Sequence, residues 1–178
     1  MDNSIDLYNT FESDNQLKPD FKKSTFDNLH SWDLGWAILR PINIAADKNQ
    51  EKLLSKRLAP GQKLLYFFWY LDAEVTNGGF IQFYWNGNRP YLSPIFDGLK
   101  LIGDHNLKTL LEEADLEYLA NKDKFISHQN KEDGLESLYD DLKSFDGFDT
   151  KYYKVHERTM ELIEKYIREN PEEFMRLI

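Results

Sequence analysis

Apolar residues recur every third or fourth position along most of the chain, a spacing typical of amphipathic helices. No stretch alternates persistently between apolar and polar residues, as a half-buried strand would. The pattern therefore predicts an all-α fold, a compact helical bundle of eight or nine helices. Two stripes carry the prediction in the C-terminal half: Leu135, Leu138, Tyr139, Leu142 and Phe145, then Tyr153, His156, Met160, Ile163 and Ile167.

Capping residues mark where several helices begin and end. We expect one helix with Ser93 as its N-cap and Gly103 just past its end. Asp104 is expected to be the N-cap of the next helix. Near the C-terminus, Asn170 and Glu173 have the spacing of a capping box, which predicts a last short helix.

The length of 178 residues suggests one domain. Residues 1–25 are mostly polar and are expected to form a loose N-terminal segment, with a single helical domain over residues 26–178. Residues 120–133 predict a long loop or a broken helix. A hydrophobic content of 41% argues against disorder. The longest apolar run, residues 64–71, is much shorter than the roughly 20 residues of a membrane span.

The chain contains no cysteine, which excludes disulfides and thiolate metal sites. This suits a reducing cytoplasm, and the acidic, polar start of the chain lacks the pattern of a signal peptide, so we expect a cytoplasmic protein. No nucleotide-binding or hydrolase motif and no close histidine pair occurs. We therefore expect no metal and no cofactor. His156 is expected to be a hydrogen-bonded core histidine, and His128 an exposed loop residue.

The stretch EVTNGGFIQFYWN interrupts two aromatic runs with a pair of glycines. Asn-Gly between apolar runs is also a hairpin signal, but Phe80, Phe83 and Tyr84 follow helical spacing. We therefore predict a helix, a Gly-Gly joint and a second helix. Either Asn77 or Gly78 is expected to take the left-handed conformation that ends the first helix.

The polar side chains of this stretch, Glu74, Asn77 and Gln82, have two interpretations. As a structural joint, they would satisfy backbone groups left without partners at a buried helix break. As a functional site, they would line a pocket of an enzyme or a small-ligand-binding protein. One carboxylate and two amides make a poor acid–base pair, which favours the joint, and we expect no catalytic residue. Solvent access to the three side chains would distinguish the two interpretations.

The Asn-Gly-Gly-Phe-x-Gln-Phe motif at residues 77–83, with LKLIG and YIRENPEEF downstream, resembles the bacterial DNA-mimic-protein-like (DMP-type) family of proteins of unknown function. The resemblance runs from about Trp32 to Phe174. It implies a compact helical fold, no known cofactor and a homodimer. It also implies DNA mimicry, which surface acids outside the motif would perform. The motif residues, at the joint or in a pocket, are Glu74, Asn77, Gly78, Gly79, Phe80, Gln82 and Asn86.

Excess negative charge is concentrated in one segment. Residues 112–149 carry 12 acids and 4 bases, whereas residues 1–90 carry 11 and 10, and residues 150–178 carry 6 and 6. Direct nucleic-acid binding would need a basic footprint, and this distribution excludes one. Because duplex DNA carries one charge per ~1.7 Å of axis, the surplus of the segment corresponds to roughly 14 Å of duplex.

This acidic segment has two interpretations. In the first interpretation, the segment is a solvated face that keeps the protein soluble. The other is a surface for a basic protein, such as a DNA-binding transcription regulator, which a non-enzymatic DNA mimic would occupy. A toxin-neutralising protein would use the same surface on a different target. Like charges four residues apart on a helix repel by ~0.2–0.5 kcal/mol per pair, a cost that favours a functional role. The candidate residues are Glu112, Glu113, Glu117, Glu132, Asp133, Glu136, Asp140 and Asp141.

Overall fold

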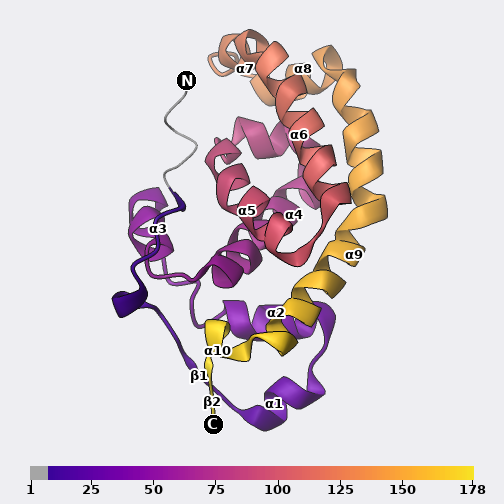
Figure 1. Ribbon diagram of the computed structural model, residues 1–178. Coiled ribbons are helices and arrows are strands. Elements are labelled where there is room, and N and C mark those ends of the chain that lie inside the picture. Colours follow the sequence, from indigo (N-terminus) through magenta and orange to yellow (C-terminus); the bar gives the residue numbers. More distant parts are fainter. Residues whose placement is uncertain (1–7) are drawn as a thin grey trace.

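The computed structural model describes residues 8–178 (Figure 1). The expected all-α class is confirmed: within these residues nine helices have seven or more residues when the broken α4 is counted as two. The helices are α1 (Lys23–Asn28), α2 (Ser31–Leu39), α3 (Lys48–Ser55), α4 (Pro60–Trp85), α5 (Leu92–Ile102), α6 (His105–Ala120), α7 (Lys122–His128), α8 (Gly134–Asp141), α9 (Asp146–Glu169) and α10 (Pro171–Phe174). Short 3-10 turns are η2 (Ser13–Asn15), η3 (Arg89–Tyr91) and η4 (Lys143–Phe145).

Helix α4 forms the centre of the core. It lies behind α5 and α6 in Figure 1, and α9 runs along its other side. Its residues 64–68 are buried all round, as expected for a helix that is apolar on every face. Phe67, Phe68, Phe80 and Phe83 have no exposed surface, and burying each such side chain stabilises the fold by about 1.5–3 kcal/mol.

The two ends of the described chain meet. Strands β1 (Asp20–Phe21) and β2 (Arg176–Leu177) form a parallel pair. Upstream of β1, Tyr8 is only 2% exposed. The buried Lys63 ammonium donates to the carbonyl oxygens of Tyr8 and Thr10, at 2.6 Å each. Residues 8–25 therefore contact the helical body. The rest of the segment expected to be loose, residues 1–7, lies outside the described residues, and the domain division stays a prediction.

Two of the three expected boundary residues between α5 and α6 are confirmed. Asp104 caps α6 by accepting a backbone N–H at 3.0 Å, and Gly103, with φ 71°, ends α5. The expectation for Ser93 is wrong, because η3 runs directly into α5, which begins at Leu92. The Ser93 hydroxyl instead accepts a hydrogen bond from the Asn9 amide at 2.9 Å.

The expected capping box at Asn170 and Glu173 does not form. The Asn170 side chain donates to the carbonyl oxygen of Tyr166, at 3.0 Å. The Glu173 carboxylate accepts from the Gly61 N–H and the Tyr166 hydroxyl, at 2.6 Å each. Neither side chain therefore accepts the backbone N–H of the other residue, as a capping box requires.

The predicted helix stripes are right with two corrections. On α9, Tyr153 is 52% exposed, and the neighbouring Tyr152 is the fully buried residue. Helix α8 ends before Leu142, and η4 carries the stripe on to Phe145. Residues 120–133 form a broken helix, since α7 follows α6 after a single residue, Asn121.

Candidate functional site

The break in α4 lies at the Gly-Gly pair, as predicted, but its geometry differs. Gly78 has φ −150° and ψ 23°, and Gly79 has φ 70° and ψ −177°. The left-handed φ therefore falls on Gly79, and the expectation of Asn77 or Gly78 is wrong. A Cβ atom on Gly79 would lie 2.3 Å from the Asp149 carboxylate, so this position requires glycine for space as well as for φ.

Backbone groups freed at the break are satisfied from other helices. Asp149 of α9 accepts the Phe80 N–H at 2.8 Å, and Tyr139 of α8 donates to the Gly78 carbonyl oxygen at 2.5 Å. Burial raises the pKa of Asp149, and the Phe80 N–H opposes this shift. The structural role that we expected for Glu74, Asn77 and Gln82 therefore belongs to two residues that the sequence did not single out.

The polar residues of the motif bond to one another instead. Glu74 accepts three amide donors: Gln82 at 2.7 Å, Asn86 at 2.9 Å and Asn88 at 3.0 Å. Asn77, which is exposed, donates to Gln82 at 2.9 Å. Glu74 and Gln82 are half-buried. This network holds the half-buried Glu74 carboxylate in place beside the joint.

Glu74 and Asn86 line an open pocket of about 440 Å³ between α3, the first half of α4 and the turn that follows α4. Gln82 and Asn77 lie behind Glu74 in the hydrogen-bond network and are not among the lining residues. The pocket is within the size range of small-molecule sites, roughly 300–1,000 Å³. Its main polar lining residues are Lys48, Glu51, Tyr70, Glu74, Asn88 and Tyr91.

Glu51 is the buried acid of this pocket, at 6% exposure. Its carboxylate accepts the Tyr91 hydroxyl at 2.6 Å and the Tyr8 hydroxyl at 3.2 Å, and the Lys48 ammonium lies 3.8 Å away. Burial raises the pKa of Glu51, against the opposing effects of Lys48 and the hydroxyl donors. Burial likewise lowers the pKa of Lys48. Perturbed, convergent groups in a pocket are typical of functional sites.

The sequence carries a signal for the burial of Glu51 in the spacing of the residues that follow it. Glu51, Leu54, Ser55 and Leu58 follow the i, i+3, i+4, i+7 spacing and are all buried. A charged residue on an apolar helix stripe is unusual, because burying an ion requires compensating partners. Lys48, one turn earlier, supplies the opposite charge.

Replacing Glu51 with glutamine should change the pH dependence of stability. A raised native-state pKa means that the favourable contribution of this carboxyl is present below about pH 4 and is lost as the pH rises through the native pKa. We expect the free energy of unfolding of Glu51→Gln, relative to wild type, to rise between about pH 4 and pH 7. Urea unfolding across this range measures the difference. The exposed Glu12→Gln is measured alongside as the control for loss of one surface charge. A flat or falling difference for Glu51→Gln would contradict the expected sign.

The eight acids of the predicted surface lie on α6, on the turn between α7 and α8, and on α8, helices that are neighbours in Figure 1. Four have a cationic or imidazole partner. Glu113 pairs with Lys151 at 3.2 Å and Asp140 with Lys143 at 3.3 Å. The other two such pairs are Glu112 with Lys108, and Asp141 with His128 at 3.1 Å.

The remaining four acids are not in ion pairs with described residues. Glu117 accepts hydrogen bonds from the neutral Asn121 and Ser144 side chains, at 2.9 and 2.6 Å. Glu132, Asp133 and Glu136 are exposed, and none has a Lys, Arg or His within ion-pair distance among residues 8–178. These three form the least neutralised part of the predicted surface.

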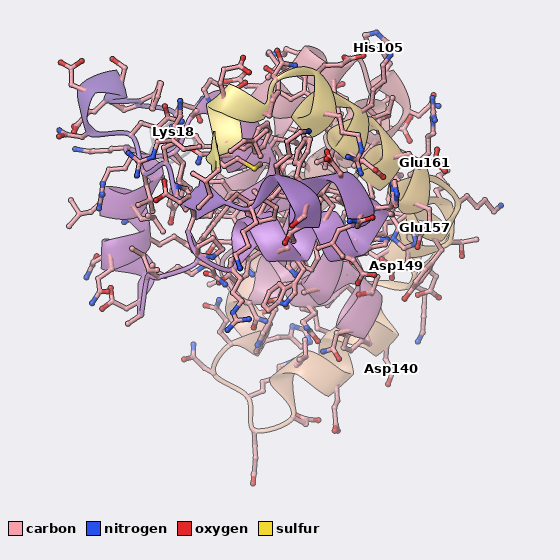
Figure 2. The ribbon with its side chains drawn as sticks, turned by 90° about the horizontal axis from the view of Figure 1, so that it is seen from below. Lys18, His105, Asp140, Asp149, Glu157 and Glu161 are labelled. Carbon is pink, nitrogen blue, oxygen red and sulfur yellow. The ribbon has the colours of Figure 1, made fainter. Side chains whose placement is uncertain are left out.

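Helix α9 carries Asp149, which belongs to the acidic segment 112–149, and two acids beyond that segment, Glu157 and Glu161. Asp149, Glu157 and Glu161 share one stripe, because they are separated by multiples of four residues, about 6 Å of helix per step. Figure 2 shows these three and Asp140 along one side of the molecule, with Lys18 on the opposite side. Glu161 is paired with Arg158 at 2.7 Å, Asp149 accepts the Phe80 N–H, and Glu157 accepts the Trp32 indole N–H at 3.0 Å, so the row is partly neutralised.

The histidines differ in part from expectation. His156 is a half-buried histidine hydrogen-bonded to Asp72 at 2.9 Å, in agreement with the prediction of a bonded core-facing ring. His128 is buried, at 4% exposure, and contacts Asp141, so the expectation of an exposed loop residue is wrong.

Within residues 8–178, no helix has the length and apolar composition needed to cross a bilayer.

Comparisons with known proteins identify relatives. Residues 56–170 match the family described as DMP19-like protein. The DNA mimic protein DMP19 of Neisseria meningitidis serogroup B (strain ATCC BAA-335 / MC58) is 27% identical to this chain over 119 residues, which are 66% of this chain and 72% of that protein. The family match includes the joint, the eight acids and the α9 row, and it begins after Lys48 and Glu51.

Proposed function

The chain belongs to the DMP19-like protein family, and from this premise we propose that it is a cytoplasmic DNA mimic, a binding protein without catalytic activity that occupies the basic surface of a DNA-binding protein. The relative named as a DNA mimic supports this role. A transcription regulator is the class of partner that fits best. A homodimer would present the acidic surface twice.

The observation that carries the proposal is the unneutralised charge at the α8 end. Glu132, Asp133 and Glu136 are exposed and lack cationic partners among the described residues. Glu157 of α9 adds a further carboxylate on the side of the molecule where Asp140 lies (Figure 2), whereas its neighbour Glu161 is paired with Arg158. Carboxylates held on helices at fixed spacing resemble a row of phosphates in their charge, and such a surface attracts the basic groups that bind DNA.

Reversal of the three unpaired acids should abolish partner capture. We expect the triple variant Glu132→Lys, Asp133→Lys, Glu136→Lys to bind its partner at least about a hundredfold more weakly, because each attraction to a basic group becomes a repulsion. The immobilised protein is used to capture proteins from bacterial lysate, which are identified by mass spectrometry. Captured DNA-binding proteins should be released as the salt concentration rises, and by added duplex DNA.

A matched control carries the same change in net charge elsewhere. Three exposed acids lie outside the eight acids of the predicted surface: Asp14, Glu169 and Glu172. Their reversal to lysine should leave capture unchanged. Equal loss in both variants would mean that net charge, rather than this surface, determines binding. Capture that duplex DNA does not displace would contradict mimicry.

A further inference from the structure

The pocket between α3 and α4 has no part in the proposed mimicry. In Figure 1, α3 lies at the left of the molecule and α9 at the right. The charged residues that line the pocket are three acids, Asp47, Glu51 and Glu74, and one base, Lys48. Asp47 is engaged in capping α3, so Glu51 and Glu74 give the pocket its negative character.

The pocket already binds one ammonium group, that of Lys48. This group lies 2.7 Å from the Asn88 side-chain oxygen and 4.0 Å from the centre of the Tyr91 ring, and it bonds the Tyr91 hydroxyl. Carboxylate, amide oxygen and aromatic face are the groups that recognise organic cations. Asn88, which is 4% exposed, links this ammonium to Glu74 through its amide nitrogen.

The hydroxyl donors of the pocket are already used, which leaves acceptors for a ligand. The Tyr91 hydroxyl donates to Glu51, and the Tyr70 hydroxyl donates to Asn43 at 2.9 Å. Glu74 accepts three hydrogen bonds, and a carboxylate can accept about four. Glu74 and the Tyr70 hydroxyl oxygen can therefore each accept a further hydrogen bond, which suits a positively charged group with several N–H donors.

We propose that this pocket binds a small organic cation through its ammonium or guanidinium group, which contacts Glu74 and the Tyr70 oxygen beside the Lys48 ammonium. The cation is either a free amine or the end of an arginine or lysine side chain. The open volume of about 440 Å³ accommodates such a group together with several carbon atoms. The inference does not depend on the proposed function, because it uses a different face of the protein.

Three probes of similar length test the charge preference on the wild-type protein. Agmatine is the cation, glutarate the anion and 1,4-butanediol the neutral control. In NMR titrations of the labelled full chain, agmatine should shift the side-chain amide signals of Asn86 and Asn88 in a saturable manner, and the other two probes should not. Absence of saturable shifts with agmatine, or equal shifts with glutarate, would overturn the proposal.

Variants test the residues. Glu74→Gln should weaken agmatine binding about tenfold or more, since it removes a charge that contacts the ligand. Lys48→Met should strengthen binding severalfold, because it removes a competing ammonium and one positive charge from the pocket. Glu169→Gln, far from the pocket, is the control and should bind as wild type. Weaker agmatine binding by Lys48→Met would contradict the assignment, because removal of a positive charge beside the ligand should not weaken the binding of a cation.

The two sources of the cation are distinguished with a blocked peptide, acetyl-Gly-Arg-Gly-amide. Tighter binding of this peptide than of agmatine identifies a protein side chain as the ligand, and weaker binding identifies a free amine. Loss of partner capture by the reversed acidic surface leaves these titrations unchanged, so the two proposals succeed or fail separately.

Discussion

Gly79→Ala is expected to lower the free energy of unfolding by about 2–6 kcal/mol, the largest effect of any alanine substitution at the joint. Two costs add. A non-glycine residue at φ 70° and ψ −177° is strained by about 1–3 kcal/mol. The new Cβ would also lie 2.3 Å from the Asp149 carboxylate, which must move and release the buried Phe80 N–H, at a cost of about 1–3 kcal/mol. Urea unfolding followed by circular dichroism measures the change.

Two other glycines serve as controls. Gly87 has the same φ of 70° but no atom within 4 Å of its would-be Cβ, so Gly87→Ala should show strain alone, about 1–2 kcal/mol. Gly147, in α9 with the same open space, should stabilise the helix by about 0.5–1 kcal/mol when it becomes alanine. If Gly79→Ala cost no more than Gly87→Ala, the close approach of Asp149 would not contribute to the joint.

The helices could be predicted because their signals are local. Apolar spacing within one turn identifies α9, and Asp104 with Gly103 marks the boundary of two helices from adjacent residues. The Gly-Gly joint was predictable for the same reason, since two glycines between helical aromatic runs favour a break.

The partners of the joint could not be predicted, because they depend on tertiary contacts. Asp149 and Tyr139 lie 69 and 61 positions from the backbone groups that they bond. Glu74, Asn77 and Gln82 lie close in sequence to the break, and proximity alone suggested them. The capping-box motif at Asn170 failed for a similar reason: a local pattern gave way to longer-range bonds made by Glu173.

Only part of the acidic surface could be predicted from the sequence. Counting identified the segment with surplus acids, but it does not determine which carboxylates are paired. Glu113 is neutralised by Lys151 from α9, whereas Glu132 has no such partner among the described residues. Charge counting along the chain also does not show which acids of α9 lie on the same side of the fold. Residues 150–178 balance in charge along the chain, while the fold places Glu157 and Glu161 on the side where Asp149 lies, with Glu161 paired to Arg158.

A single glutamine at the start of α4 connects both ends of the described chain. Gln62 has no exposed surface. Its amide nitrogen donates to the carbonyl oxygens of Leu17 and Phe174, at 2.8 and 2.9 Å. Its side-chain oxygen accepts the Ala59 N–H at 2.9 Å. Strand β1 follows Leu17 and strand β2 follows Phe174 within a few residues, and two strands of two residues cannot hold these segments together alone.

Gln62→Leu should therefore lower the free energy of unfolding by about 3–6 kcal/mol, although leucine is apolar and similar in size. The substitution leaves three backbone groups without their side-chain partner, at about 1–3 kcal/mol for each that stays buried. Urea unfolding measures the total, and hydrogen exchange should show faster exchange at the Arg176 and Ile178 amides, which bond to residues 19 and 21. The exposed Gln50, which accepts one backbone bond, is the control, and Gln50→Leu should cost less than about 1 kcal/mol. Equal costs at the two positions would mean that the buried bonds of Gln62 do not hold the ends of the chain.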